Sequence, residues 1–139
     1  MRAKGSRAMT AYVLDTSAIL AWIQGETGGD YVANLLTQEC KLSAVNLTEL
    51  VTKLLDNNHT APQNLGQQLR TLGIEICAFD EAQAITAGIL RKQTRAKGLS
   101  LGDRACLSLA MELQAVVLTG DTAWKELNLP IEVVDIRAG

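Results

Sequence analysis

Four carboxylates stand at positions from which one fold could bring them into a single site. Asp15 ends the apolar run "YVLD", and Asp121 follows the run "AVVLTG". Glu49 and Asp103 each lie near the start of a segment with helical periodicity. No lysine or arginine between positions 8 and 40 is available to neutralise Asp15. Two carboxylates about 5 Å apart repel each other by roughly 3 kcal/mol at an effective dielectric of about 20, so a converged group requires a cation or bound protons.

The available donor atoms indicate which cation such a group would hold. His59, in the polar stretch "NNHTAP", is the only histidine, so a zinc site, a Cys–His pair or a Ser-His-Asp triad would depend on this one residue. Carboxylate oxygens without imidazole or thiolate favour the hard ions Mg²⁺ and Mn²⁺. One or two such ions suit phosphoryl chemistry, because they activate water and stabilise charge on the phosphate.

Helix capping is the structural alternative for each acid. Glu49 and Asp103 lie three residues after Asn46 and Ser100, which is the spacing of a capping box. Asp121 precedes "TAWKEL" and fits the N-cap of a short helix. Taken singly, Glu49 and Asp121 are better explained as caps, since acids are common in the first turn of helices.

Capping explains Asp15 and Asp103 less well. Asp15 could cap the segment "TSAIL", but it ends a strand expected in the middle of a sheet that is buried on both faces. Asp103 shares a helical face with Cys106, Leu107 and Ala110, at the spacings i+3, i+4 and i+7. An unpaired carboxylate on a packing face is costly, so both acids favour a functional role.

Short β-rich runs alternate with longer segments of helical period, which predicts a parallel sheet covered by helices on both faces. The predicted strands are 11–15, 41–45, 74–79, 115–119 and 132–136. The predicted helices are 17–24, 30–39, 47–57, 62–72, 81–97, 102–113 and 122–127. Functional residues of such folds gather beyond the carboxyl ends of the strands, so the four acids could meet at one edge of the sheet.

Length and composition favour one globular domain. The chain has 139 residues, of which 47% are hydrophobic and 20% are charged. No apolar run approaches the ~18 residues of a membrane-spanning helix, and no membrane association is predicted. Three separated cysteines do not form a disulfide framework, so a cytoplasmic location is expected. Residues 1–8 are expected to be a flexible basic tail, compatible with a vector origin, followed by a single domain over 9–139.

Basic residues cluster late in the chain although the net charge is −2. The stretch "RKQTRAKGLSLGDR" contains Arg91, Lys92, Arg95, Lys97 and Arg104. Such a cluster is more often a solvated helix face than a ligand site. The functional alternative is an electrostatic contact with the phosphates of a nucleic acid.

Four motifs carry a resemblance to a known family. "YVLDTSAIL", "NLTELV", "GLSLGDRACLSLA" and "VLTGDTAW", in this order and spacing, resemble the PIN-domain ribonucleases, and most closely the VapC-type toxins of toxin–antitoxin pairs. The resemblance implies a PIN-like three-layer α/β/α sandwich with a central, mostly parallel sheet of about five strands. It also implies a Mg²⁺- or Mn²⁺-dependent endoribonuclease that hydrolyses RNA phosphodiester bonds.

The resemblance assigns roles to particular residues. The acids Asp15, Glu49, Asp103 and Asp121 match the four acids that hold one or two metal ions. Thr16, Ser17 and Thr119 match hydroxyls that support the metal or water. A homodimer and a cognate antitoxin whose tail enters the active-site groove are the implied partners, with RNA as the substrate.

Two other functions stay open. One is a metal-dependent phosphatase or phosphotransferase on a similar sheet, with Asp15 as the nucleophile. Haloacid-dehalogenase-like enzymes carry a second aspartate two positions after the first, and Ser17 stands there in this sequence. The other alternative is a catalytically inactive module that keeps the fold to bind a partner protein. Such a module would be expected to have lost some of the four acids, and all four are present.

Overall fold

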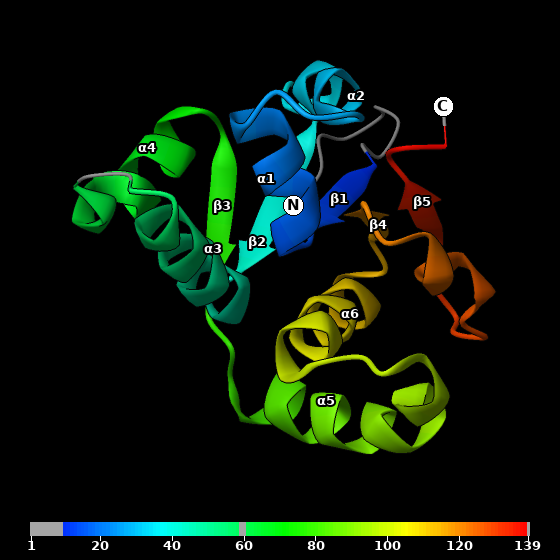
Figure 1. Ribbon diagram of the computed structural model, residues 1–139. Coiled ribbons are helices and arrows are strands. Elements are labelled where there is room, and N and C mark those ends of the chain that lie inside the picture. The colour runs from blue at the N-terminus through cyan, green and yellow to red at the C-terminus, as the bar shows by residue number, and fades with distance from the viewer. Residues whose placement is uncertain (1–9, 59–60, 139) are drawn as a thin grey trace, which may run out of the picture.

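The computed structural model describes residues 10–58 and 61–138, so the predicted basic tail at 1–8 and the single histidine, His59, lie outside the described residues. Its centre is one sheet of five strands in the order β3-β2-β1-β4-β5, with every neighbouring pair parallel (Figure 1). The strands are β1 (Ala11–Leu14), β2 (Glu39–Ser43), β3 (Ile74–Cys77), β4 (Val116–Thr119) and β5 (Val133–Asp135).

Helices cover both faces of this sheet. They are α1 (Thr16–Ile23), α2 (Gly29–Leu35), α3 (Ala44–Asp56), α4 (Leu65–Thr71), α5 (Glu81–Thr94) and α6 (Leu101–Leu113). Three 3₁₀ segments, η1 (Pro62–Asn64), η2 (Arg95–Lys97) and η3 (Thr122–Glu126), complete the connections. Helices α5 and α6 lie on the opposite side of the sheet from α1 and α2 (Figure 1). The predicted three-layer α/β/α sandwich is therefore confirmed.

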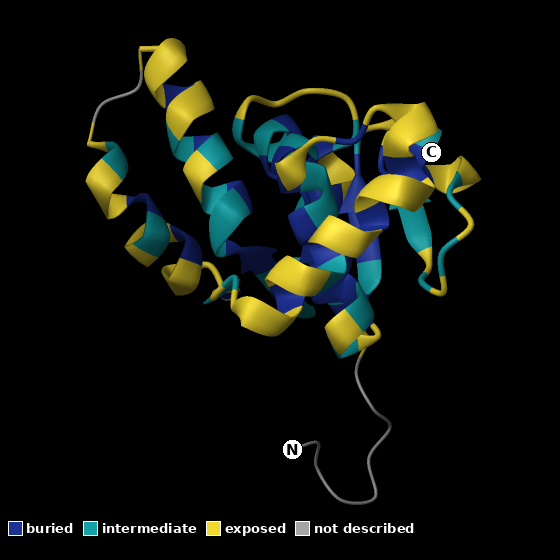
Figure 2. Ribbon diagram, turned by 90° about the horizontal axis from the view of Figure 1, so that it is seen from below, coloured by how far each residue is buried: buried dark blue, intermediate teal, exposed yellow. Residues whose placement is uncertain are grey.

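Alternation along the central strand explains the two layers. Successive side chains of a strand point to opposite faces. Leu14 of β1 belongs to the core that packs with α1 to α4, whereas its neighbour Val13 belongs to the core formed with α6. Both side chains are fully buried, and Figure 2 shows the buried residues gathered between the helices and the sheet. No helix of the described ranges is long and apolar enough to cross a membrane.

Two predicted boundaries around β2 are wrong. The strand predicted at 41–45 ends at Ser43, and α3 begins at Ala44 rather than at residue 47. The cause is a local cap, because the Ser43 hydroxyl accepts a hydrogen bond from the backbone N–H of Val45. Asn46 therefore lies inside α3, and the predicted Asn46–Glu49 capping box does not exist.

The strand order creates a switch point between β1 and β4. The chain moves outward from β1 to β2 and β3, and then returns over the other face through α5 and α6 to β4, on the free side of β1. Ligands of open α/β sheets bind where the order reverses in this way, beyond the carboxyl ends of the strands. Asp15 extends the pairing at this point, since its N–H donates to the carbonyl of Leu118.

Candidate active site

All four predicted acids line one cavity of about 600 Å³ at the switch point. Asp15 comes from the end of β1, Glu49 from α3, Asp103 from the first turn of α6, and Asp121 from the end of β4. The predicted hydroxyls of Thr16 and Ser17 also line it. The convergence expected at one edge of the sheet is thus present.

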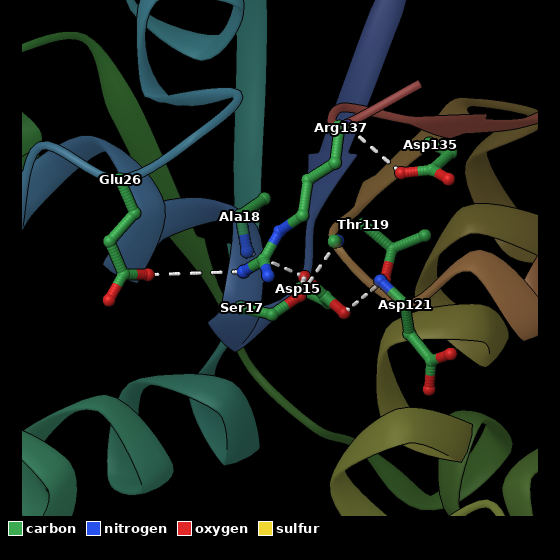
Figure 3. Close-up of polar contacts among 9 residues, drawn as sticks. Asp15, Ser17, Ala18, Glu26, Thr119, Asp121, Asp135 and Arg137 are labelled. Carbon is green, nitrogen blue, oxygen red and sulfur yellow. Dashed lines mark hydrogen bonds and ion pairs between the residues drawn. The ribbon is translucent and has the colours of Figure 1, made fainter.

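Asp15 is both a helix cap and a buried acid of the cavity. Its Oδ1 accepts hydrogen bonds from the Ala18 N–H at 2.8 Å and the Ser17 hydroxyl at 2.7 Å (Figure 3). Its Oδ2 accepts from the Thr119 hydroxyl at 2.6 Å. Burial raises the pKa of Asp15 to about 6, against the lowering effect of these hydrogen bonds. Ionisation of Asp15 therefore destabilises the folded protein when no cation is bound.

Two hydroxyls join the ends of β1 and β4. Ser17 donates to Asp15 and accepts from the N–H of Gly120 at 2.8 Å. Thr119 donates to Asp15 and accepts from the N–H of Asp121 at 3.0 Å. Asp121 in turn caps η3, because its Oδ1 accepts from the Ala123 N–H at 3.0 Å. The predicted cap at Asp121 is confirmed, and these two hydroxyls orient the acids.

Glu49 lies in the second turn of α3 and is held from two sides. Its Oε1 accepts from the Thr16 hydroxyl at 2.6 Å and from Asn46 Nδ2 at 2.9 Å. Asn46 Nδ2 also donates to the Gly102 carbonyl at 3.1 Å, which joins α3 to α6. A Cβ at position 102 would lie 2.0 Å from Glu49 Oε2, so only glycine leaves room for this carboxylate.

Asp103 combines the two explanations offered by the sequence. It forms the predicted capping box, in which its Oδ2 accepts from the Ser100 N–H at 2.9 Å and its own N–H donates to the Ser100 hydroxyl at 3.2 Å. Partial burial raises the pKa of Asp103, and the nearby charges of Glu49 and Asp121 raise it further. Asp103 is therefore a cap whose carboxylate also contributes to an acidic field.

The oxygen donors of the cavity fit a hard divalent cation. Glu49 Oε2, Asp103 Oδ1 and Asp121 Oδ2 accept no hydrogen bond from any described residue. No described lysine or arginine lies within ion-pair distance of the four acids. As they stand, however, no three acids, histidines or cysteines of residues 10–58 and 61–138 are grouped as ready metal ligands. Glu49, Asp103 and Asp121 each have one oxygen held within the protein, and both oxygens of Asp15 are held, so these carboxylates must turn to bind an ion together.

The predicted RNA-binding residues do not lie at this cavity. None of Arg91, Lys92, Arg95, Lys97 and Arg104 is among its lining residues. Arg104 Nη1 donates to the Ala87 carbonyl at 2.8 Å, because α5 packs along α6 and covers this side of the helix. Lys97 forms an ion pair with Glu126. The remaining three side chains are exposed on α5 and η2.

Two cations that sequence reasoning missed do line the cavity. Lys53 lies one turn of α3 beyond Glu49, and Arg137 follows β5 at its carboxyl end. The rule that identified Asp121, which looks just beyond the carboxyl ends of strands, would also have selected Arg137. The position of Arg137 directly after the last predicted strand was the sequence signal that could have identified it as a site residue.

Replacing Asp15 with asparagine should stabilise the protein in the absence of divalent ions. The pKa of Asp15 lies near 6 in the fold against 3.8 ordinarily, which corresponds to roughly 3 kcal/mol of destabilisation by the ionised carboxylate well above pH ~6. We expect a gain of about 1–2 kcal/mol at pH ~8, less than the full amount because the asparagine amide nitrogen cannot accept the hydrogen bond from Thr119. The gain should shrink toward zero by pH ~3, where both states of the wild type bind the proton. Urea unfolding in EDTA at both pH values measures it; a variant less stable than wild type at pH ~8 would contradict the burial argument.

A family model described as the PIN domain matches residues 12–129. The fold is also similar to three solved structures. A toxin–antitoxin complex from Klebsiella pneumoniae aligns with a TM-score of 0.72 at 16% identity, covering 90% of this chain and 97% of that chain. DNA-bound VapBC from Salmonella typhimurium aligns with a TM-score of 0.68 at 24% identity, covering 92% and 99% respectively.

The third structure, FitAcB from Neisseria gonorrhoeae, aligns with a TM-score of 0.68 at 22% identity, covering 90% of this chain and 97% of that chain. No curated protein matches this sequence. At these identities the solved structures establish the fold, and the family model spans most of the chain together with its four acids. The chain belongs to the PIN domain family.

Proposed function

We propose that this protein is a Mg²⁺- or Mn²⁺-dependent endoribonuclease and the VapC-type toxin of a toxin–antitoxin pair. The observation that carries the proposal is the cavity in which acids from four separate segments meet without a described basic partner. PIN-domain membership supports the nuclease activity. The all-oxygen donor set supports Mg²⁺ or Mn²⁺ over zinc.

The side chains would divide the work as follows. Asp15, Glu49 and Asp103 would hold the principal cation, and Asp121 would hold a second cation or orient the attacking water. Ser17 and Thr119 fix the Asp15 carboxylate, and Thr16 fixes Glu49. When bound, the divalent ion supplies a Lewis acid that stabilises charge on the phosphate and favours deprotonation of water.

The phosphotransferase alternative is less well supported. It requires Asp15 to attack a phosphate, but Asp15 is only 4% exposed and both of its carboxylate oxygens already accept hydrogen bonds. A nucleophile must approach its target directly. Asp15 is better suited to help hold a cation than to form a covalent intermediate.

The proposed partners are RNA, a cognate antitoxin and a second copy of the chain, all in the cytoplasm. Several solved structures with this fold are toxin–antitoxin complexes, and the Salmonella VapBC complex is bound to DNA. These neighbours support an antitoxin partner for the present chain. The exposed arginines and lysines of α5 and η2 remain candidates for weaker, salt-sensitive contacts with RNA outside the cavity.

Metal removal tests the proposal. Purified protein should cleave single-stranded RNA with Mg²⁺ or Mn²⁺ and lose this activity in EDTA, and activity should return when excess Mn²⁺ is added. Gel analysis of labelled RNA measures cleavage, and an antitoxin-free preparation is required. Equal cleavage with and without EDTA would rule out the proposed metal dependence.

A further inference from the structure

A single arginine enters the rim of the acid cavity from the end of β5. Arg137 and Lys53 are the only basic residues of the described chain among those that line the cavity. Figure 3 shows the Arg137 side chain reaching away from β5 toward Glu26, across the ends of the strands that carry Asp15 and Thr119. The acids of the site therefore face a cation that none of them binds in a close ion pair.

The backbone at Arg137 is fixed while its side chain is free to adjust. The Arg137 N–H donates to Asp135 Oδ1 at 2.9 Å, and Asp135 is only 7% exposed. The preceding residue, Ile136, is buried, and its N–H donates to the Thr119 carbonyl at 2.9 Å. These bonds anchor the segment beside β4, so that the arginine is always presented to the same cavity.

Gly120 makes room for the guanidinium group. A Cβ at position 120 would lie 2.7 Å from Arg137 Nε and 3.1 Å from its Cζ. The guanidinium thus lies against the backbone at the end of β4, between Thr119 and Asp121 in the chain. The Gly120 N–H itself donates to Ser17, which holds Asp15. The Arg137 guanidinium therefore packs against the residue whose N–H is hydrogen-bonded to the hydroxyl that holds Asp15.

The charge of Arg137 is only loosely paired. Arg137 Nη2 lies 3.9 Å from Glu26 Oε1, and the two side chains are 41% and 50% exposed. Exposed ion pairs of this kind contribute little stability, so exchange for another anion costs little. The guanidinium plane presents several N–H donors that match two oxygens of a phosphate.

We propose that Arg137 binds the two non-bridging oxygens of an RNA phosphate beside the scissile bond, exchanging Glu26 for the substrate. The inference rests on the proposed nuclease function and names a substrate-binding residue of its site. A second cavity of about 490 Å³ is lined by Trp22 and Tyr31, and Glu26 and Arg137 line both this cavity and the acid cavity. A chain of nucleotides can therefore continue past Arg137 on either side.

A purely structural role is the competing explanation. In that case Arg137 ties the C-terminal segment to the loop between α1 and α2, and Glu26 is its necessary partner. The two explanations differ in the effect of Glu26→Gln. The structural tether predicts the same defect as the loss of Arg137, whereas the substrate contact predicts equal or tighter RNA binding because a competing acid is removed.

Steady-state cleavage of a short fluorescein-labelled single-stranded RNA of mixed sequence, with Mn²⁺ present, separates these explanations. Arg137→Gln should raise KM about 10- to 100-fold with a smaller effect on kcat, as expected for the loss of a charge-assisted hydrogen bond. The slope of log(kcat/KM) against log[salt] is negative and should become less steep by about 0.7. Arg137→Lys should recover part of the loss, and Glu26→Gln should not raise KM.

Arg70→Gln is the matched control, because Arg70 is an exposed arginine on α4 outside the acid cavity. A wild-type KM and salt slope in Arg137→Gln would overturn the inference while the nuclease function stands. Equal increases of KM in Arg137→Gln and Glu26→Gln would identify the tether and also overturn it. A wild-type protein that cleaves no RNA would overturn the proposed function, and the inference with it. Thermal unfolding shows whether each variant is folded. If Arg137→Gln is unfolded, the KM of folded Arg137→Lys decides instead, because lysine keeps the charge and loses the two-point contact. A wild-type KM in Arg137→Lys would then overturn the inference.

Discussion

Asp103→Asn should lower RNA cleavage by about 100- to 1,000-fold while the protein stays folded. The amide oxygen of asparagine can still accept the hydrogen bond that Asp103 Oδ2 now receives from the Ser100 N–H, so the cap of α6 is kept. What is lost is the charge that the cation requires. Because burial and the charges of Glu49 and Asp121 raise the pKa of Asp103, its neutralisation also relieves repulsion in the metal-free protein.

Asp80→Asn provides the matched control for this prediction. Asp80 is the N-cap of α5 and its Oδ1 accepts from the Gln83 N–H at 2.9 Å, whereas Asp103 is the third residue of the α6 capping box and accepts from the Ser100 N–H. Asp80 does not line the acid cavity. Both variants lose one negative charge at the start of a helix, and both keep a side-chain oxygen that can accept the backbone hydrogen bond. Single-turnover cleavage in Mn²⁺ should be close to wild type in Asp80→Asn. Comparable rates in the two variants would show that Asp103 has no role beyond capping.

Gly102→Ala should damage both stability and activity, although alanine ordinarily favours helices over glycine by about 1 kcal/mol. The new Cβ would lie 2.0 Å from Glu49 Oε2 and 2.5 Å from Oε1, so the carboxylate must leave Thr16 and Asn46. We expect a loss of about 1–3 kcal/mol in the free energy of unfolding, as for other overpacked sites. Cleavage should fall about 10- to 100-fold, because the displaced Glu49 is a proposed metal ligand.

Two further variants isolate the cause. Gly88→Ala in α5 places its Cβ where no atom lies within 4 Å, so it should stabilise by about 0.5–1 kcal/mol. In a Glu49→Ala background the collision is absent, and Gly102→Ala should then be neutral or stabilising. Chemical unfolding of the four members of this double-mutant cycle measures the coupling. Additive effects of Glu49→Ala and Gly102→Ala would mean that the two positions do not collide.

Local patterns predicted most of the fold. The apolar run of β1 and the helical period of α3 and α6 depend only on neighbouring residues, and the structure confirms these elements. The start of α3 was wrong because a single hydroxyl, that of Ser43, ends the strand and caps the helix within one residue. Either Ser43 or Asn46 is an acceptable cap by residue type, so the sequence alone did not distinguish them.

The candidate site was predictable only in part. The four acids could be placed at one edge because each follows a strand or begins a helix, and all four line the cavity. Capping and function had been treated as alternatives, whereas Asp15 and Asp103 are caps that also face the cavity. The role of Arg104 could not be read locally, since its guanidinium is engaged by a carbonyl of α5. The position of Arg137 was open to the same strand-end rule that selects Asp121, but its contacts with Gly120 and Glu26, which are distant in sequence, could not be predicted.

Titration of Mn²⁺ into metal-free protein by calorimetry tests the cation site most directly, because it needs no RNA substrate. Wild-type protein should bind Mn²⁺ in a saturable manner, and Asp103→Asn and Asp15→Asn should each weaken binding by about tenfold or more, while Asp80→Asn binds as wild type does. Wild-type protein that takes up no Mn²⁺, or that binds it no more tightly than Asp103→Asn, would contradict the account.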